Sequence, residues 1–176
     1  YVAPAKETVA IFLNRWLDTY AVTNTRERTM IGYRGVVKRY LLPSLGPLML
    51  ASLRPDHVQA LYASMRERGL SARTILHTHR LLKEALSHAV KWQVLSKNVC
   101  DVVDAPRPDR KEMAAMDVEQ VSRFLAASRS SRFHSLFYLA LYTGMRRSEV
   151  LAMRWEDVDL DISVLHVTAG LHRIYG

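Results

Sequence analysis

A short segment around residue 146 places a glycine, a cation and a carboxylate at a spacing that suits phosphate chemistry. An apolar stretch ends at Gly144, Arg146 opens the next helical pattern, and Glu149 follows three residues later. A cation in the first turn of a helix opposes the helix dipole, so its placement is explained if Arg146 and the free N–H groups of the turn together hold an anion. Glu149 lies on the same face and can orient the guanidinium. The alternative is an ordinary surface Arg–Glu pair, which contributes little to stability.

A second candidate site is a row of polar side chains on the helix predicted from Ser71 to Trp92. Ser71 can cap this helix, and apolar residues at helical spacing predict a buried face opposite the row. An α-helix fits the major groove of B-DNA, where Arg pairs with guanine edges and Lys with phosphates, and free N–H groups beyond Ser71 can hold a phosphate. The alternative is that this polar face is simply exposed to solvent. Only one acidic residue, Glu84, interrupts the basic side chains along it. The predicted DNA contacts of this helix are Ser71, Arg73, His77, Arg80, Lys83, Ser87 and Lys91.

The preceding helical pattern supplies a second group of cations. Asn24 or Thr25 can cap this helix, which is expected to run to about Tyr40 before Pro43 and Gly46 stop it. A second basic helix beside the first would offer a partner surface to the same DNA. Its cations are Arg26, Arg28, Arg34, Lys38 and Arg39, of which we predict Arg26, Arg34 and Lys38 as DNA contacts.

Two glycines, Gly32 and Gly35, lie inside this second helix, where each costs about 1 kcal/mol relative to alanine. They predict a close approach of the backbone, either to another helix or to a ligand. Apolar residues at helical spacing also predict helices near residues 9–17 and 55–69. His79 is expected to pack in the core.

The C-terminal part of the sequence begins with a capping box, in which Asp117 caps a helix and Gln120 lies three residues further on. A nearly continuous apolar run over residues 131–142 predicts a buried helix, and a short helix is expected over residues 146–153. Alternating β-branched residues at 162–167 predict the first strand of the chain.

The charge of the chain is unevenly distributed. The 176 residues contain 25 Lys and Arg against 17 Asp and Glu, a net charge of +8. All of this excess lies in residues 1–110, whereas residues 111–176 carry equal numbers of both signs. Between the two parts, the run from Asp104 to Lys111 holds two prolines and a cluster of charges, which favours an extended linker. The pattern predicts two units, of which the first meets a polyanion.

The composition excludes several classes of protein. No apolar run approaches the ~18 residues of a membrane span, and no signal-peptide pattern opens the sequence. The single cysteine, Cys100, excludes a disulfide framework and fits an intracellular setting. His77 and His79 are two residues apart and point away from one another on a helix, so they cannot share a metal ion. We expect no metal site and no cofactor.

The motif around Arg146 resembles that of a known family. The residues from Thr143 to Glu149, followed by those from Trp155 to Asp159, are similar to the first catalytic motif of the tyrosine recombinase, or phage integrase, family. Several features of the first part resemble that family's helical core-binding domain, namely Trp16, Thr29, Tyr33, the run from Leu42 to Gly46, the helix from Ser71 to Lys91, and Asn98.

The resemblance implies a mainly α fold, in which a helical SAM-like core-binding bundle is joined by a linker to the truncated helical start of an α+β catalytic domain. It places the core-binding domain at residues 1–106, the linker at 107–111 and the N-terminal part of the catalytic domain at 112–176. Such enzymes clamp duplex DNA at attachment or core-type sites. The full-length enzyme is expected to act as a homotetramer on DNA, in the cytoplasm of a bacterium, with no membrane partner.

The reaction that the resemblance implies is the cleavage and rejoining of DNA strands. A tyrosine attacks the scissile phosphodiester and forms a 3′-phosphotyrosyl intermediate, while arginines stabilise the developing charge without metal or nucleotide energy. Arg146 matches the family's first catalytic arginine, and Glu149 matches the acidic residue that supports it. No catalytic role is assigned to Arg147.

The sequence departs from the family pattern after the first strand. The family's catalytic lysine, His-x-x-Arg motif and nucleophilic tyrosine have no counterpart: His172-Arg173 lacks the spacing, and Tyr175 stands too close to Arg146 in the sequence. The nucleophile is therefore expected to be absent from this chain, which should bind DNA without cutting it.

Two alternative functions remain. One is a stand-alone helical DNA-binding regulator or recombinase-derived accessory factor, and the other is a helical protein–protein module, whose affinity for DNA would not fall steeply with salt.

Overall fold

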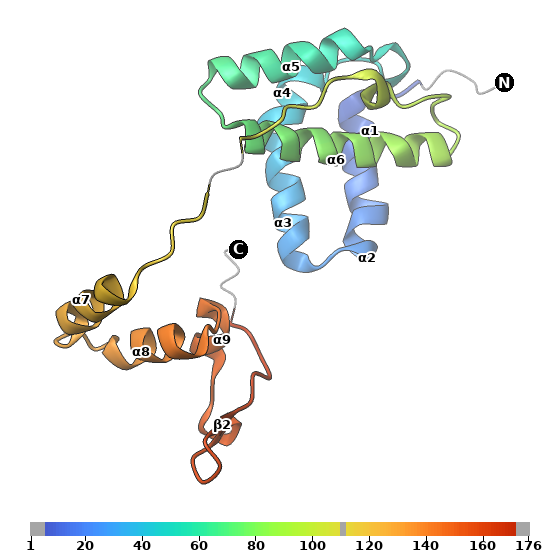
Figure 1. Cartoon of the computed structure of the whole chain (residues 1–176). Coiled ribbons are helices and arrows are strands. Elements are labelled where there is room, and N and C mark those ends of the chain that lie inside the picture. The colour runs from blue at the N-terminus through green and yellow to red at the C-terminus, as the bar shows by residue number, and fades with distance from the viewer. Residues whose placement is uncertain (1–5, 110–111, 172–176) are drawn as a thin grey trace. The chain divides into compact units, whose positions relative to one another are not determined.

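The computed structural model describes residues 6–109 and 112–171 and divides the chain into two compact units, residues 1–111 and 112–176 (Figure 1). Residues 104–109 have no regular secondary structure, and residues 110–111 of the predicted linker lie outside the described residues. The sequence features at His172, Arg173 and Tyr175 also lie outside them. Among the described residues, no helix is both long enough and apolar enough to cross a membrane.

The first unit begins with a hairpin of two long helices, each interrupted by a π-helical turn. The first arm contains α1 (Val9–Trp16), η1 (Leu17–Ala21) and α2 (Val22–Asn24), and the second contains α3 (Glu27–Val36), η2 (Val37–Leu41) and α4 (Leu42–Leu45). A π-helical turn inserts an extra residue into the helical repeat, so it rotates every later side chain around the helix. The second arm runs past the predicted end at Tyr40, because Pro43 lies in the first turn of α4, where a proline is tolerated, rather than stopping the helix.

The start of the second arm differs from the sequence prediction. The Asn24 side chain donates to the carbonyl of Tyr20, and the Thr25 hydroxyl donates to the carbonyl of Ala21, so both residues close the first arm instead of capping the second. The N-cap position of α3 is occupied by Arg26. The local sequence suits either role, because the same side chains can cap a helix start or bond the last carbonyls of the helix before it.

Of the two close approaches predicted from the glycines of α3, the approach of another helix is wrong. A Cβ atom placed on Gly32 would meet no other atom within 4 Å, and one placed on Gly35 would meet only the side chain of Arg39. Neither glycine is therefore required by the packing of another helix.

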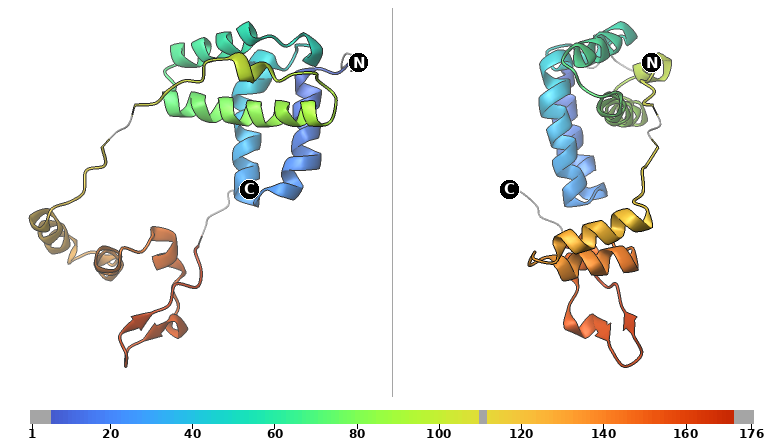
Figure 2. Two further views of the ribbon diagram at one scale, coloured as in Figure 1. Left: turned by 45° about the vertical axis from the view of Figure 1, so that its right-hand side comes forward. Right: turned by 60° about the vertical axis from the view of Figure 1, so that its left-hand side comes forward.

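The remaining elements of the first unit cover one side of this hairpin. They are η3 (Leu50–Ser52), α5 (Pro55–Glu67), α6 (Ala72–Lys91) and η4 (Val99–Val102). Figures 1 and 2 show α6 lying across the two arms, with α5 beside it. The predicted N-cap of α6 is confirmed, since the Ser71 hydroxyl accepts the N–H of Thr74, and Gly69 ends the preceding segment with φ of 76°. The predicted apolar face is confirmed too, because Ile75, Leu82, Leu86 and Ala89 are all buried.

An aromatic cluster joins the two layers of the first unit. Trp16 is fully buried, and its ring stacks against those of Tyr20 and Tyr33 with centroids 6.2 and 5.9 Å apart. Its indole N–H donates to Nδ1 of His88 on α6, at 3.2 Å. Because a buried indole N–H needs an acceptor, this bond fixes α6 against the first arm.

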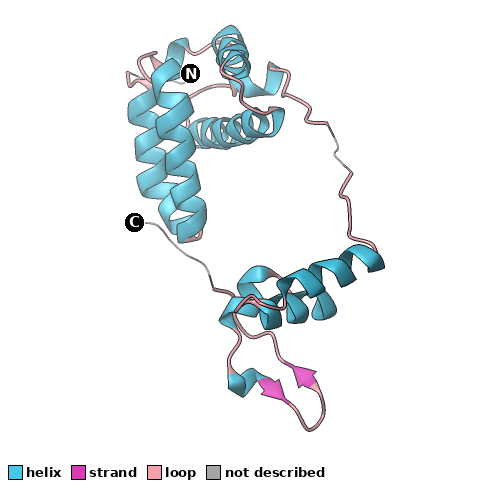
Figure 3. Ribbon diagram, turned by 90° about the vertical axis from the view of Figure 1, so that its left-hand side faces the viewer, coloured by secondary structure: helices cyan, strands magenta, loops and turns pink. Residues whose placement is uncertain are grey.

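The described residues of the second unit, 112–171, form three α-helices and a two-stranded antiparallel sheet (Figure 3). The helices are α7 (Val118–Ser128), α8 (His134–Thr143) and α9 (Arg147–Ala152), followed by the turn η5 (Trp155–Asp157) and the strands β1 (Val158–Asp159) and β2 (Val164–Leu165). The capping box at Asp117 is confirmed, with the Gln120 side chain accepting the Asp117 N–H. The strand predicted over 162–167 is shorter than expected, and β1 precedes it in the chain.

The prediction that α8 is buried is wrong. None of its residues is buried, although the helix is almost entirely apolar. Among the described residues only α7 and α9 pack closely against it, so one side of the helix remains exposed. An apolar run predicts that other elements bury the helix on most sides. Here the neighbouring elements cover only part of the surface of α8.

We predict that His79 makes the stability of the first unit depend on pH. The Tyr62 hydroxyl lies 2.6 Å from Nδ1 of this buried histidine, and burial, helped by Lys83 and Arg80, lowers the pKa of His79. The unfolded chain therefore takes up this proton at a higher pH than the folded chain. The free energy of unfolding should be unaffected above about pH 6.5 and should fall below it, by at most about 1.4 kcal/mol per pH unit.

Urea titrations of helical circular dichroism between pH 7.5 and pH 5 measure this effect. His79→Gln keeps an acceptor for Tyr62 and should flatten the slope, whereas His77→Gln, which changes an exposed histidine of the same helix, should leave it unchanged. The assignment is wrong if the His79 variant retains the wild-type slope.

Candidate nucleic-acid interface and phosphate site

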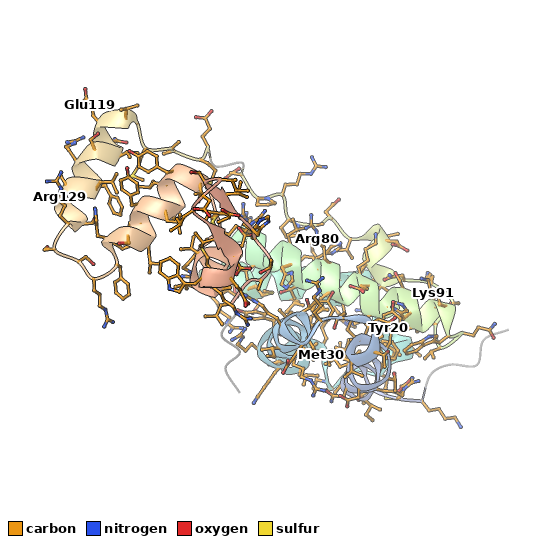
Figure 4. The ribbon with its side chains drawn as sticks, turned by 90° about the horizontal axis from the view of Figure 1, so that it is seen from below. Tyr20, Met30, Arg80, Lys91, Glu119 and Arg129 are labelled. Atoms are coloured by element: carbon orange, nitrogen blue, oxygen red, sulfur yellow. The ribbon has the colours of Figure 1, made fainter. Side chains whose placement is uncertain are left out.

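The exposed face of α6 carries most of the cations predicted for it. Arg73, His77, Arg80 and Lys91 are all exposed, and none forms an ion pair with a carboxylate of the described residues. They follow one another at intervals of four, three and eleven residues, so they lie on one side of the helix. Figure 4 labels Arg80 and Lys91 along α6, with Tyr20 and Met30 on the two arms of the hairpin beneath it. Arg73, Arg80 and Lys91, together with His77, form the basic row of α6.

Two residues predicted for this row are held by the protein itself. The Lys83 ammonium lies 2.9 Å from a carboxylate oxygen of Asp101. The Ser87 hydroxyl donates to the carbonyl of Lys83 and accepts a hydrogen bond from Asn98. Asn98 also donates to the Lys83 carbonyl at 2.9 Å and accepts the N–H of Cys100 at 3.0 Å. Lys83 and Ser87 thus anchor the segment that contains η4, and the exposed row is narrower than the sequence predicts.

Ser71 is occupied as a cap. Its hydroxyl accepts the N–H of Thr74 at 3.2 Å and lies 2.9 Å from the Thr74 hydroxyl. The residue is exposed next to the start of α6, and its hydroxyl is engaged by Thr74.

The cations predicted on the second arm are dispersed. Arg26 is exposed at the start of α3, and Lys38 is exposed on η2. Arg34 forms an ion pair with Asp18 of the first arm, at 2.8 Å, and so spans the hairpin. The two basic helices are joined at a different point, where the Tyr33 hydroxyl donates to Glu84 of α6 at 3.2 Å.

The structure adds a cationic pair that sequence reasoning recognised only in part. The guanidinium groups of Arg39 and Arg68 lie 5.9 and 6.0 Å from the ring centroid of Tyr40. Neither forms an ion pair with a described carboxylate. Arg39 is one of the cations predicted on the second arm, but Arg68 ends α5, and no local pattern links residues 29 positions apart. Cations held over a ring face lose less freedom when they bind an anion.

The phosphate candidate in the second unit is organised around one carboxylate. Glu149 accepts the backbone N–H of Arg146 at 2.8 Å and its guanidinium at 2.9 Å. These two bonds, the backbone bond first, lower the pKa of Glu149. The Arg146 side chain is 83% exposed and that of Glu149 20% exposed, so the carboxylate holds one side of the guanidinium while its other donors face solvent.

The turn before Arg146 has the geometry that its sequence predicts. Gly144 adopts φ of 67° and ends α8, with its N–H bonded to the carbonyl of Ala140. This left-handed conformation suits glycine. Arg146 itself stands at the N-cap position of α9 rather than within its first turn, so the predicted conflict with the helix dipole is smaller than expected.

The segment after β2 forms a wall beside Arg146. An open depression is lined by Arg146, Ser148, Glu149 and the run from Val167 to Gly170. Asp157 fixes this run, because its carboxylate accepts the Thr168 hydroxyl at 2.9 Å and its carbonyl accepts the N–H of His166. The N–H of Leu171 donates to the carbonyl of Ser148, which holds the end of this run against α9.

Other reactive groups in the described residues have structural surroundings. No group of three or more His, Cys, Asp or Glu side chains in residues 6–109 and 112–171 is placed to hold a metal ion. Burial raises the pKa of the Cys100 thiol to about 12. The thiol therefore stays protonated at neutral pH and is a poor nucleophile.

Comparisons with known proteins identify the family. The family described as "Phage integrase, N-terminal SAM-like domain" matches residues 8–66, and the family described as "Phage integrase family" matches residues 114–174. The first match covers about half of the first unit, and the second covers almost all of the second unit. The chain belongs to the phage integrase family of tyrosine recombinases.

Relatives match across almost the whole chain. An integrase of Saccharopolyspora erythraea is 29% identical over 168 residues, which are 94% of this chain and 38% of that protein. A XerC-like tyrosine recombinase of Caldanaerobacter subterraneus is 26% identical over 95% of this chain and 44% of its own length. The chain thus spans less than half the length of these curated relatives.

A solved structure supports the same fold. The integrase of transposon Tn1549, in complex with transposon right end DNA, matches 96% of this chain and 55% of that chain, with a TM-score of 0.84 and 23% identity. The predicted fold class is confirmed: the chain is mainly helical, with a SAM-like domain followed by the start of an integrase catalytic domain.

We predict that Asn98 is the main polar support of the segment that ends the first unit. It is 7% exposed, and Asn98→Ala removes all three of its hydrogen bonds, which leaves the Cys100 N–H without its partner. The free energy of unfolding should fall by about 2–3 kcal/mol. Urea unfolding measures this loss.

Asp101→Asn is the matched control for this prediction. It removes the exposed ion pair to Lys83 but leaves Asn98 intact, so it should cost less than about 1 kcal/mol. Equal losses in the two variants would mean that the ion pair, and not Asn98, holds the segment.

Proposed function

We propose that this chain is the DNA-binding part and the first catalytic segment of a site-specific DNA recombinase. The observation that carries the proposal is the basic row of α6, in which Arg73, Arg80 and Lys91 are exposed without carboxylate partners among the described residues. Family membership supports it, and the Tn1549 integrase of the same fold is in complex with transposon DNA. Duplex DNA is the proposed partner.

The proposed docking places the exposed face of α6 in the major groove. The width of this groove accepts an α-helix, arginine can pair with guanine edges, and lysine can bind phosphates. All of the net charge of +8 falls in residues 1–110, which supports attraction to the DNA backbone in addition to base contacts. Arg26 and Lys38 would add phosphate contacts from the second arm.

The proposed chemistry assigns different roles to Arg146 and Glu149. In the longer protein, a tyrosine oxygen would attack the scissile phosphorus, a 3′-phosphotyrosyl bond would form, and the 5′-oxygen would leave with a proton. Arg146 would stabilise the charge that develops on the phosphate oxygens, and Glu149 would orient its guanidinium. The printed sequence holds no His-x-x-Arg motif after Arg146, so we expect this chain to bind DNA without forming a covalent complex. A homotetramer on DNA is the assembly proposed for the longer protein.

We predict that the basic row supplies affinity through phosphate and base contacts. In the 176-residue chain, Arg80→Gln should weaken binding to duplex DNA about ten-fold at moderate salt, because an unpaired cation is lost from the interface. If Arg80 contacts a phosphate, the slope of log affinity against log salt should also decrease by about 1. Fluorescence anisotropy with a labelled duplex measures both.

Arg54→Gln is the charge-matched control. Arg54 is already paired with Asp56 at the start of α5, so its loss should leave the affinity nearly unchanged. If the wild-type chain binds DNA with an affinity that does not depend on salt, the proposed function is wrong.

We predict that Arg146 acts in catalysis rather than in binding. In the complete reading frame, Arg146→Gln should reduce covalent protein–DNA complexes on a nicked suicide substrate by at least about 100-fold, while binding stays within about two-fold. Arg147→Gln changes the adjacent exposed cation and should retain covalent complexes. Undiminished complex formation by the Arg146 variant contradicts the assignment.

A further inference from the structure

One acidic side chain lies within the basic row of α6. Glu84 is the only carboxylate in the helix, four residues after Arg80 and seven before Lys91. Its position on the helix is therefore on the same side as the exposed cations. A carboxylate here reduces the attraction of the surface for phosphate, so its presence needs a separate explanation.

The Glu84 carboxylate is held from the other helix. The Tyr33 hydroxyl donates to Oε2 of Glu84 at 3.2 Å. Burial first, and then the charge of Glu84, raise the pKa of Tyr33, so the hydroxyl stays protonated and remains a donor. The Tyr33 ring stacks on the fully buried Trp16, which fixes the tyrosine in turn.

The charge of Glu84 is not neutralised by the cations around it. No ion pair joins it to a described Lys or Arg, although Arg80 is at the spacing at which such pairs form on a helix. Lys83, the adjacent cation, is engaged by Asp101 instead. Glu84 is therefore a half-buried, oriented acceptor with one oxygen bonded to Tyr33 and no side-chain partner for the other among the described residues.

A carboxylate on a helix that enters the major groove has one favourable kind of partner. It is repelled by phosphates, by the O6 and N7 acceptors of guanine and by O4 of thymine, but it accepts a hydrogen bond from the exocyclic amino group of cytosine. Adenine also offers an amino group, but the N7 acceptor next to it repels the second carboxylate oxygen. Cytosine is therefore the base that fits Glu84.

We propose that Glu84 is a specificity-determining residue that selects a cytosine in the DNA site, with Tyr33 as its positioning residue. The proposal rests on the proposed function, because it requires the exposed face of α6 to meet the major groove. Arg73, Arg80 and Lys91 supply affinity, and Glu84 supplies discrimination at one position while lowering the affinity for DNA in general.

Binding-site selection from a library of random duplexes tests this role with the 176-residue chain. The wild-type chain should enrich cytosine at one position, with roughly ten-fold weaker binding when that base pair is changed. Glu84→Gln keeps an acceptor for Tyr33 but presents an amide, which pairs with adenine through N6 and N7. This variant should lose the cytosine preference, gain adenine at the same position, and bind random duplex DNA more tightly than wild type does.

Two further variants separate this role from general electrostatics and from folding. Glu67→Gln makes the same change in charge at the exposed end of α5, so it should keep the cytosine preference. Tyr33→Phe retains the ring that stacks on Trp16 but removes the donor, and should weaken discrimination several-fold without loss of helical circular dichroism.

Each result has a distinct meaning. A Glu84→Gln variant that selects the same cytosine as wild type overturns the assignment, as does a wild-type chain that binds duplex DNA with no cytosine preference. The proposed function stands in both cases. A wild-type chain with no salt-dependent affinity for duplex DNA overturns the proposed function and this assignment together.

Discussion

The arrangement of the first unit depends on the burial of one indole. Trp16 is fully buried, stacks on Tyr33 of the second arm, and donates its N–H to His88 of α6. Burying so large a ring is strongly favourable, but only where its N–H finds an acceptor, so this residue restricts both neighbours at once. Since His88 is on α6, the contact also sets which face of that helix is covered and which remains in solvent.

The exposed face of α6 is limited by contacts with its neighbours. Tyr33 of the second arm holds Glu84 within the basic row, and Asn98 bonds to the carbonyl of Lys83 and the hydroxyl of Ser87. The basic row consists of the side chains that these contacts leave exposed. Its cations form no ion pair with a described carboxylate: Asp101 is bound to Lys83, and Glu84 accepts the Tyr33 hydroxyl. The exposed positive charge of α6 therefore depends on how the elements around it pack.

The sequence predicts what is local and misses what depends on distant contacts. Caps at Ser71 and Asp117 and the buried face of α6 follow from spacing over a few residues, and the structure has them. The second arm runs past its predicted end because Pro43 lies in the first turn of α4, where a proline is tolerated and does not stop the helix. The pairing of Lys83 with Asp101 joins residues 18 positions apart, so no helical pattern could reveal that this cation is engaged. In the second unit, the apolar run of α8 correctly predicts a helix but not its exposure, because burial depends on neighbours that the run itself does not specify.

The two candidate sites use carboxylates in opposite ways. Glu149 binds Arg146 directly, so the pair carries little net charge and adds little to the attraction of a resting phosphate. In the role proposed for it, Arg146 offers a guanidinium already oriented, whose free donors would gain most when additional negative charge develops on a phosphate during reaction. Glu84 is bound by a hydroxyl and not by a cation, and in its proposed role it would discriminate between bases by attraction and repulsion. The proposed roles of the two carboxylates therefore differ because their partners differ. Glu149, paired with an arginine, would support transition-state stabilisation, and Glu84, bonded to a tyrosine, would support base selection.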